Sequence, residues 1–271
     1  MAKIVKELPF TVELPENSEH LNMIIYGDTG TGKTYLCGSA LDFEGSSPTL
    51  FIDFEGGTKT LHGRKIDVVR PKNWKEIQTI YEYLYHDNEK YKSVVIDSLT
   101  ELQKKFSMGA IMGQFDEDNN NYADLENSVA PTRQDWLRSG EQMRKTIRAF
   151  RDLAYLPETS RRVHVIMTAL EKYDEKKRII CPSLPGSLAY ECGALVDIFA
   201  RLSKQAVTVI NPETKEEKVI TRRHLLTEEH VDETDLKYTA KNRGGRLGKQ
   251  MWDPTIAKIL GVWKENPKDD L

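Results

Sequence analysis

The feature that most constrains this chain is a glycine-rich segment near its start, which matches the pattern G-x-x-x-x-G-K-[ST] at every fixed position. An apolar run over residues 21–26 predicts a buried strand directly before the segment, and residues 36–41 predict a helix directly after it. Glycines let a backbone wrap around a phosphate, so that consecutive N–H groups and a helix N-terminus point at negative charge. The sequence therefore predicts a strand, a phosphate-binding loop and a helix, in that order.

This segment and the residue after it are the predicted nucleotide-binding residues. They are Gly27, Asp28, Thr29, Gly30, Thr31, Gly32, Lys33, Thr34 and Tyr35. Lys33 is expected to reach the β- and γ-phosphates and to take part in catalysis, and Thr34 is expected to hold Mg²⁺. The alternative is a glycine-rich turn without a ligand, which fits less well because a strand and a helix flank the segment as the motif requires.

Composition narrows the class of protein. The chain has 271 residues, of which 39% are hydrophobic and 30% charged, a balance typical of a soluble, globular protein, and a cytoplasmic location is the default expectation. No apolar run approaches the ~20 residues of a membrane helix, and the first residues lack the apolar core of a signal peptide. The 3 cysteines show no C-x-x-C spacing, which argues against a disulfide framework and a zinc site. The net charge of −3 means that any nucleic-acid role must use a local basic surface.

Hydrophobic periodicity predicts strands that alternate with helices, and hence an α/β fold with a mainly parallel sheet covered on both faces. Strands are expected over residues 21–26, 49–54, 66–69, 91–97, 163–168, 198–202, 206–210 and 236–240. Helices are expected over residues 73–85, 99–112, 132–155 and 254–260. A turn over residues 211–214 is expected to fold residues 207–210 onto residues 218–221 as a C-terminal β-hairpin.

One domain over residues 1–271 is the economical interpretation of this order. Its expected parts are an N-terminal arm over 1–20, a mobile acidic loop over 113–131, a hairpin with a basic motif over 206–245, and a C-terminal helix and tail over 246–271. The acidic loop is assigned from its run of Asp, Glu and Asn residues.

Two carboxylates follow apolar runs that predict core strands. Asp97 ends one run, and Glu55 follows another and precedes two glycines. Because the C-terminal ends of parallel strands meet at one edge of a sheet, Asp97 is expected beside the phosphate-binding loop, where it could help to hold Mg²⁺. Glu55 could orient and polarise the water that attacks the γ-phosphate. The alternatives are an Asp that caps the next helix and a solvated Glu at a strand end.

The runs Phe51-Ile52-Asp53-Phe54-Glu55 and Val94-Val95-Ile96-Asp97-Ser98 resemble RecA-type ATPases. In that family a Glu after the second core strand is the hydrolytic base, and the Mg²⁺-linked Asp is followed by Ser. The resemblance implies the catalytic role for Glu55 and the metal role for Asp97. Thr168 lies where the family has a polar sensor of the γ-phosphate, a loose match because the family usually has an amide there.

Lys241-Asn242-Arg243-Gly244-Gly245 resembles the lysine-x-arginine motif of RecA-like ring ATPases, including the DnaB helicases and the bacterial RadA recombination protein. In those proteins the pair reaches from one subunit into the ATP site of its neighbour. Two cations opposite the γ-phosphate stabilise transition-state charge, and supplying them in trans couples hydrolysis to assembly. The resemblance thus implies catalytic roles for Lys241 and Arg243. The alternative is a basic turn with glycines.

The overall layout is similar to phage-encoded RecA-like ATPases of the single-strand-annealing and recombination group, which are AAA-type nucleotide-binding proteins. The resemblance implies a RecA-like P-loop NTPase fold, Mg²⁺-dependent ATP hydrolysis with ATP and Mg²⁺ as cofactors, and assembly into a ring or filament. It also implies binding of single-stranded DNA, a phage recombination or single-strand-binding protein as a partner, and a place in the host cytoplasm.

Two basic clusters are candidates for DNA contact. The candidate nucleic-acid residues after the strand over 163–168 are Lys172, Tyr173, Lys176, Lys177 and Arg178. In RecA-like proteins a mobile DNA-binding loop leaves the sheet at this point, and a basic loop with an aromatic ring could hold phosphates while the ring stacks on a base. The alternative is a solvated charged hairpin. The second cluster, on the predicted long helix, is Arg144, Arg148 and Arg151 on one face.

Two other functions remain open on the same scaffold. A small-molecule or nucleoside kinase would need an arginine-rich lid, for which Arg161-Arg162 and Arg222-Arg223 are the available residues. An ATP-dependent switch with a protein partner would leave the basic clusters as ordinary surface.

Overall fold

The structure is a computed structural model that describes residues 19–114, 130–210, 215 and 217–265. Most of the predicted N-terminal arm, most of the predicted acidic loop, the turn over 211–214 and the end of the C-terminal tail lie outside the described residues. Among the described residues, no helix combines the length and the apolar character that crossing a bilayer requires.

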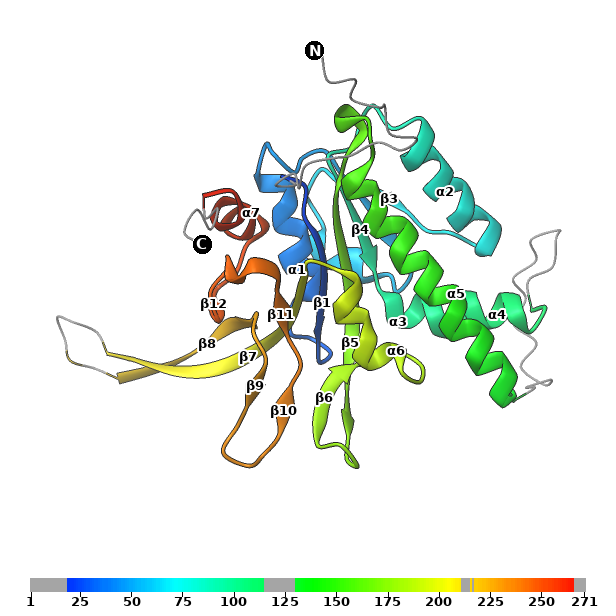
Figure 1. Ribbon diagram of the computed structural model, residues 1–271. Coiled ribbons are helices and arrows are strands. Elements are labelled where there is room, and N and C mark those ends of the chain that lie inside the picture. Colours follow the sequence, from blue (N-terminus) through cyan, green and yellow to red (C-terminus); the bar gives the residue numbers. More distant parts are fainter. Residues whose placement is uncertain (1–18, 115–129, 211–214, 216, 266–271) are drawn as a thin grey trace, which may run out of the picture.

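A central sheet with a parallel core organises the chain (Figure 1). Its strands lie in the order β12-β8-β7-β1-β5-β4-β2-β3, and the run from β7 to β3 is parallel throughout. The parallel strands are β1 (Asn22–Gly27), β2 (Thr49–Asp53), β3 (Asp67–Val69), β4 (Ser93–Asp97), β5 (His164–Asp174) and β7 (Ile198–Ile210). Every residue of β1, β2 and β4 is buried, which explains why these strands read as continuous apolar runs.

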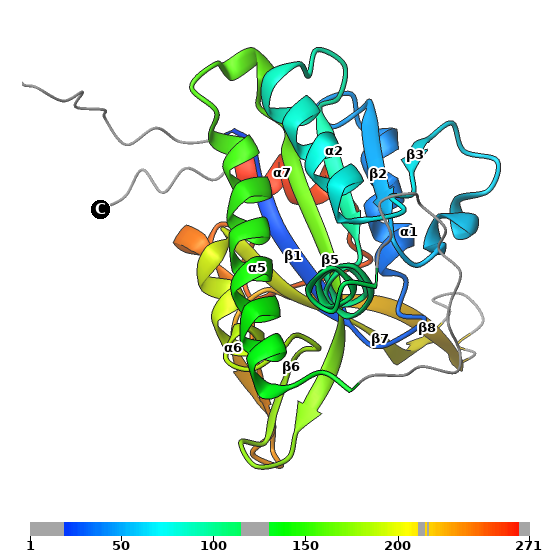
Figure 2. The same ribbon diagram turned by 90° about the vertical axis from the view of Figure 1, so that its right-hand side faces the viewer.

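Helices cover both faces of this sheet (Figures 1 and 2). Along β1, Ile24 and Tyr26 pack into a core shared with α2 and α5, whereas Met23 and Ile25 pack into a core shared with α1 and α7. The helices are α1 (Lys33–Gly38), α2 (Trp74–His86), α3 (Leu99–Glu101), α4 (Met108–Ile111), α5 (Arg133–Asp152), α6 (Leu188–Glu191) and α7 (Ile256–Glu265). The fold class predicted from the sequence is confirmed.

Antiparallel strands extend the sheet beyond β7. They are β8 (Glu217–Leu226), β11 (Lys241–Asn242) and β12 (Gln250–Trp252). Beside the sheet, β6 (Ile179–Pro182) pairs antiparallel with the end of β5, β10 (Lys237–Tyr238) pairs parallel with β6, and β9 (His230–Val231) pairs antiparallel with β10. β7 and β8 form the predicted C-terminal hairpin, a long ribbon that projects from the body in Figure 1. β12 pairs with β8 and closes that edge.

Most elements shift by a few residues from their predicted bounds, and three predictions differ from the structure in kind or by more than that. The two strands predicted over 198–202 and 206–210 are one strand, because β8 pairs with β7 continuously past the polar residues between them. The strand predicted over 163–168 runs on to Asp174, because β6 pairs with its polar second half. The helix predicted over 99–112 consists of α3, a π-helical segment over Leu102–Ser107 and α4.

Candidate nucleotide-binding site

The glycine-rich segment connects β1 to α1 as the sequence predicts. Gly30 and Gly32 have φ values of 74° and 96°, a region in which side chains with a Cβ are strained. At Gly27 a Cβ would lie 2.2 Å from the carbonyl oxygen of Leu202, so the close approach of β7 also requires glycine there. The backbone therefore turns tightly between the end of β1 and the N-terminus of α1, where its N–H groups can face an anion.

Lys33 is buried in this loop. Its Nζ donates hydrogen bonds to the carbonyl oxygens of Gly27 and Asp28, each at 2.9 Å. Burial lowers the pKa of the Lys33 ammonium, and the nearby carboxylates of Glu55 and Asp97 oppose that shift. Because carbonyl oxygens are weaker partners than phosphate oxygens, the ammonium is poised to exchange them for a phosphate.

The Asp97 carboxylate, at the end of β4, accepts hydrogen bonds both from α1 next to the loop and from β5. Thr34 Oγ1 donates to Asp97 Oδ2 at 2.6 Å, and Thr168 Oγ1 donates to Asp97 Oδ1 at 2.5 Å. Asp97 is only 1% exposed, and Thr168 is fully buried. The three side chains come from three segments far apart in sequence, and the structure brings them together as predicted.

The same place suits a divalent cation. A Cβ at Gly57 would lie 3.1 Å from both Thr34 Oγ1 and Asp97 Oδ2, so the glycine leaves open space beside this pair of oxygens. Hydroxyl and carboxylate oxygens are the ligands that Mg²⁺ prefers. Thr34 and Asp97 therefore fit the predicted metal site in both chemistry and available room.

Glu55 lies at the rim of the same site, just beyond the end of β2. Its carboxylate accepts a hydrogen bond from Ser98 Oγ. Partial burial raises the pKa of Glu55; the Ser98 hydrogen bond opposes this, and the charge of Asp97 adds to it. A carboxylate with a raised pKa beside the metal position is suited to accept a proton from water.

Asp53 shapes the turn that presents Glu55, and sequence reasoning missed it. Its Oδ1 accepts the backbone N–H groups of Glu55, Gly56 and Gly57 at 3.2, 2.7 and 3.1 Å. Its Oδ2 accepts the Thr58 hydroxyl at 2.5 Å and lies 3.3 Å from Arg70 Nη2. An acidic residue that interrupts an apolar run just before a Gly-Gly pair was the available signal.

One cavity of about 400 Å³ unites most of the predicted site. Its lining includes the predicted residues Thr29, Gly30, Gly32, Lys33, Thr34, Tyr35, Glu55 and Asp97. Gly57, Thr60, Leu170 and Arg223 complete the lining and were not assigned to the nucleotide site from the sequence. The arrangement of a phosphate loop, a buried lysine, a pair of metal-binding oxygens and a carboxylate is chemically suited to a nucleoside triphosphate.

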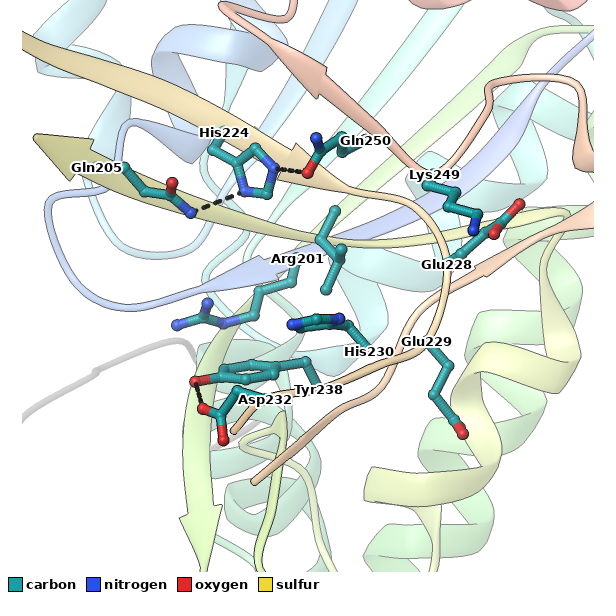
Figure 3. A pocket seen from close by; sticks show the side chains of 11 residues that line it. Arg201, Gln205, His224, Glu228, Glu229, His230, Asp232, Tyr238, Lys249 and Gln250 are labelled. Carbon is teal, nitrogen blue, oxygen red and sulfur yellow. Dashed lines mark hydrogen bonds between the residues drawn. The ribbon is translucent and has the colours of Figure 1, made fainter. Parts of the chain in front are cut away.

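A second cavity, also of about 400 Å³, lies on the β7–β8 ribbon (Figure 3). It is on the face that carries His224, opposite the face from which Arg223 lines the first cavity. Several of its polar groups pair with other residues of the chain. Arg201 pairs with Glu171 at 2.8 Å and lies over the Tyr238 ring, and the Tyr238 hydroxyl donates to Asp232.

Lys241 and Arg243 lie at the opposite end of the sheet from the loop. Lys241 is paired with Phe199, next to Ile198, which is level with Met23 near the start of β1. Lys241 Nζ donates to two backbone carbonyl oxygens at 3.0 and 2.8 Å, and Arg243 Nε lies 2.7 Å from Asp197 Oδ1. Among the residues that the structure describes, neither Lys241 nor Arg243 lines the cavity at the Gly27–Thr34 loop. Their action on a neighbouring subunit stays a prediction.

The candidate DNA-contact residues lie at the end of β5, which forms a hairpin with β6, and in the turn between the two strands. Lys172 Nζ donates to the carbonyl oxygen of Leu184 at 2.7 Å, and Lys177 Nζ lies 3.6 Å from the centre of the Tyr190 ring. Arg178 donates to the carbonyl oxygen of Thr234. Tyr173 is 51% exposed, and Lys176 is also exposed. Lys177 and Arg178 are exposed as well despite these contacts, whereas Lys172 is half-buried. Contact of this cluster with DNA stays a prediction.

The basic cluster on α5 is partly engaged within the chain. Arg144 pairs with Glu141 and with Glu191, and Arg151 pairs with Asp152. These carboxylates neutralise much of the positive charge that a nucleic acid would need to find on this helix.

One family model and several solved structures resemble the chain. A model described as "AAA domain" matches residues 19–243. The RadB recombinase is similar at 14% identity and a TM-score of 0.40, over 82% of this chain and 91% of that chain. An ATPase from the type III secretion system of pathogenic bacteria is similar at 15% identity and a TM-score of 0.45, over 68% of this chain and about half (51%) of that one. None of the curated proteins compared with the chain matches it.

Proposed function

Since the chain belongs to the family of AAA domains, whose model covers residues 19–243, we propose that it binds ATP with Mg²⁺ in the cavity at the loop and hydrolyses it. The observation that carries the proposal is the meeting of Thr34, Asp97 and Glu55 at one rim of the cavity that Lys33 also lines. These are the group types that phosphoryl transfer to water requires, and they come from the start of α1, the end of β4 and the turn after β2.

Each side chain then has a defined part in hydrolysis. Lys33 would exchange the loop carbonyls for the phosphates, and Thr34 and Asp97 would hold Mg²⁺, which would supply positive charge against the phosphates. Glu55 takes a proton from a water whose oxygen forms a bond to the γ-phosphorus. The bond from that phosphorus to the β–γ bridging oxygen breaks, and ADP and phosphate leave. Thr168 fixes the orientation of Asp97 through their hydrogen bond.

Replacing the base while keeping the site's shape tests this proposal. Glu55→Gln should bind ATP as the parent does and should lose nearly all turnover, because an amide cannot accept the proton. Glu82→Gln is the matched control, since it makes the same change on the exposed side of α2. Binding is measured by calorimetry and turnover by phosphate release. A Glu55→Gln protein that hydrolyses ATP at the parental rate removes Glu55 from its role.

We further propose that the chain assembles, and that the assembled form binds single-stranded DNA in recombination or replication. Two features support this. The Lys241–Arg243 segment lies far from its own cavity, as a pair acting on a neighbour would. The β5–β6 hairpin carries the exposed Tyr173 on the same strand as Thr168, so DNA and nucleotide would bind to one continuous element.

The ATPase rate per chain tests both parts. It should rise with protein concentration and again when single-stranded DNA is added, and the DNA effect should weaken as salt rises. Arg243→Ala should abolish the dependence of the ATPase rate on protein concentration. The control is Arg161→Ala, which removes an arginine that pairs with Glu158 at the surface and should leave that dependence unchanged. A rate that is indifferent to concentration and to DNA refutes this second proposal and leaves the first standing.

A further inference from the structure

The β7–β8 ribbon brings an arginine onto the phosphate-binding loop. Arg223 lies on β8 opposite Lys204 of β7. Its backbone is held on both sides by Asp253: the Arg223 N–H donates to Asp253 Oδ1 at 3.1 Å, and the Arg223 carbonyl oxygen accepts from the Asp253 N–H at 2.8 Å. Because side chains alternate along a strand, Arg223 faces the loop, whereas its neighbour His224 lines the cavity on the other face.

The guanidinium of Arg223 lies directly against two loop residues. Its central carbon is 4.3 Å from the centre of the Tyr35 ring. A Cβ added at Gly32 would lie 2.6 Å from Arg223 Nε. Glycine at position 32 therefore serves the fit of this side chain as well as the turn of the loop.

The Nε of Arg223 is buried, and within the described part of the chain it has no hydrogen-bond acceptor. Leaving a charged donor buried without an acceptor is unfavourable, and buried donors in proteins are nearly always paired. A ligand that enters the cavity, which Arg223 lines, can supply the missing acceptor.

The charges that line the cavity also call for a second cation. Lys33 and Arg223 are the cations of the described lining, and Glu55 and Asp97 are its anions. Without Arg223 the lining would be net negative, although it has to accept a highly charged anion. Tyr35, which is 54% exposed, keeps the guanidinium beside the N-terminus of α1, where the loop N–H groups gather.

We propose that Arg223 is a nucleotide-binding residue that contacts the α- and β-phosphates of the nucleotide held by its own chain. This inference rests on the proposed function. The position along the cavity selects these phosphates: Arg223 lies at Gly32 and Tyr35, whereas Thr34, Asp97 and Glu55 define the metal and γ-phosphate end. Binding of nucleotide would thereby fix the ribbon to the loop.

The test compares Arg223→Ala, Arg223→Lys and the control Arg222→Ala. Arg222 carries the same charge one residue earlier, pairs with Asp253 at 2.7 Å and does not belong to the described lining of the cavity. Affinities for ADP and for inorganic tripolyphosphate are measured by calorimetry, and folding is checked by thermal unfolding. A charged hydrogen bond corresponds to roughly 10- to 100-fold in affinity, so Arg223→Ala should lose about that much for both ligands. Arg223→Lys should recover part of it, and Arg222→Ala should match the parent.

Each other outcome overturns the assignment. Parental affinity in Arg223→Ala shows that the arginine does not contact the ligand. A loss for ADP with unchanged tripolyphosphate binding places the contact on the base or ribose instead. If Arg223→Ala does not fold, the uncharged variant Arg223→Gln replaces it, and parental affinities of that variant for both ligands also overturn the assignment. A parent protein that binds neither ligand refutes the proposed function itself, which is a distinct result.

Discussion

Asp53 offers a quantitative test of how the site is built, because it holds the turn that presents Glu55 without lining the cavity itself. Replacing it with Asn keeps one carbonyl oxygen, which can still accept the N–H groups of Glu55, Gly56 and Gly57. The new amide nitrogen then meets the Thr58 N–H and the Arg70 guanidinium, which are both donors. The change therefore removes a buried charge-assisted network and places donors against donors.

The expected loss of folding stability follows from the hydrogen bonds that this substitution weakens or removes. Hydrogen bonds to charged groups contribute about 1.5–3 kcal/mol; the retained bonds lose their charge, and two donor–donor contacts replace those of Thr58 and Arg70 with the carboxylate. Asp53→Asn should thus lower the free energy of unfolding by about 2–4 kcal/mol, and it should reduce the ATPase rate more than ATP affinity, because Glu55 moves while the loop stays. Urea unfolding and steady-state kinetics measure the two effects.

The control for this experiment is Asp67→Asn, which makes the same chemical change at an exposed ion pair with Lys90. Exposed pairs add little to stability, so its unfolding midpoint should stay close to that of the parent. Parental stability and parental turnover in Asp53→Asn would refute the view that this carboxylate organises the Glu55 turn.

Two further predictions concern proton and metal. The pKa of Glu55 is raised above its ordinary value of 4.5, so its carboxylate takes up a proton at a higher pH than a free Glu, and turnover should fall as pH drops through that raised pKa. Ser98→Ala removes the hydrogen bond that lowers this pKa, so the acid limb of the kcat profile should move to higher pH; an unmoved limb would assign it to another group. Thr34→Ala should weaken the Mg²⁺ dependence of nucleotide binding by roughly tenfold or more, and Thr79→Ala on α2 should not; identical Mg²⁺ titrations of the two would exclude Thr34 as a ligand.

Much of the sheet and of the loop could be predicted from the sequence, because their signals are local. Buried parallel strands read as apolar runs, and the phosphate-binding loop has a fixed spacing of glycines, lysine and threonine. The positions of Glu55 and Asp97 followed from strand ends, since parallel strands place those ends at one edge of the sheet. The structure confirms that these residues come together.

What escaped prediction depends on contacts between distant segments. β5 continues to Asp174 only because β6 pairs with its polar half, and β7 runs unbroken because β8 pairs with it. Asp53 binds N–H groups of a turn whose conformation no periodicity encodes. Arg223 reaches Gly32 across about 190 residues of sequence, through a ribbon whose position relative to the loop depends on tertiary packing.

The central claim is that a nucleoside triphosphate binds in the cavity at the Gly27–Thr34 loop, and calorimetric titration of MgATP into the parent, Lys33→Ala and Lys75→Ala proteins tests it most directly. Lys75 lies on α2 and does not belong to the described lining of the cavity. The parent and Lys75→Ala should bind one nucleotide per chain with equal affinity. Lys33→Ala should bind roughly 10- to 100-fold more weakly, because a charged contact to the phosphates is gone. Equal affinities in all three proteins, or no binding by the parent, would contradict the claim.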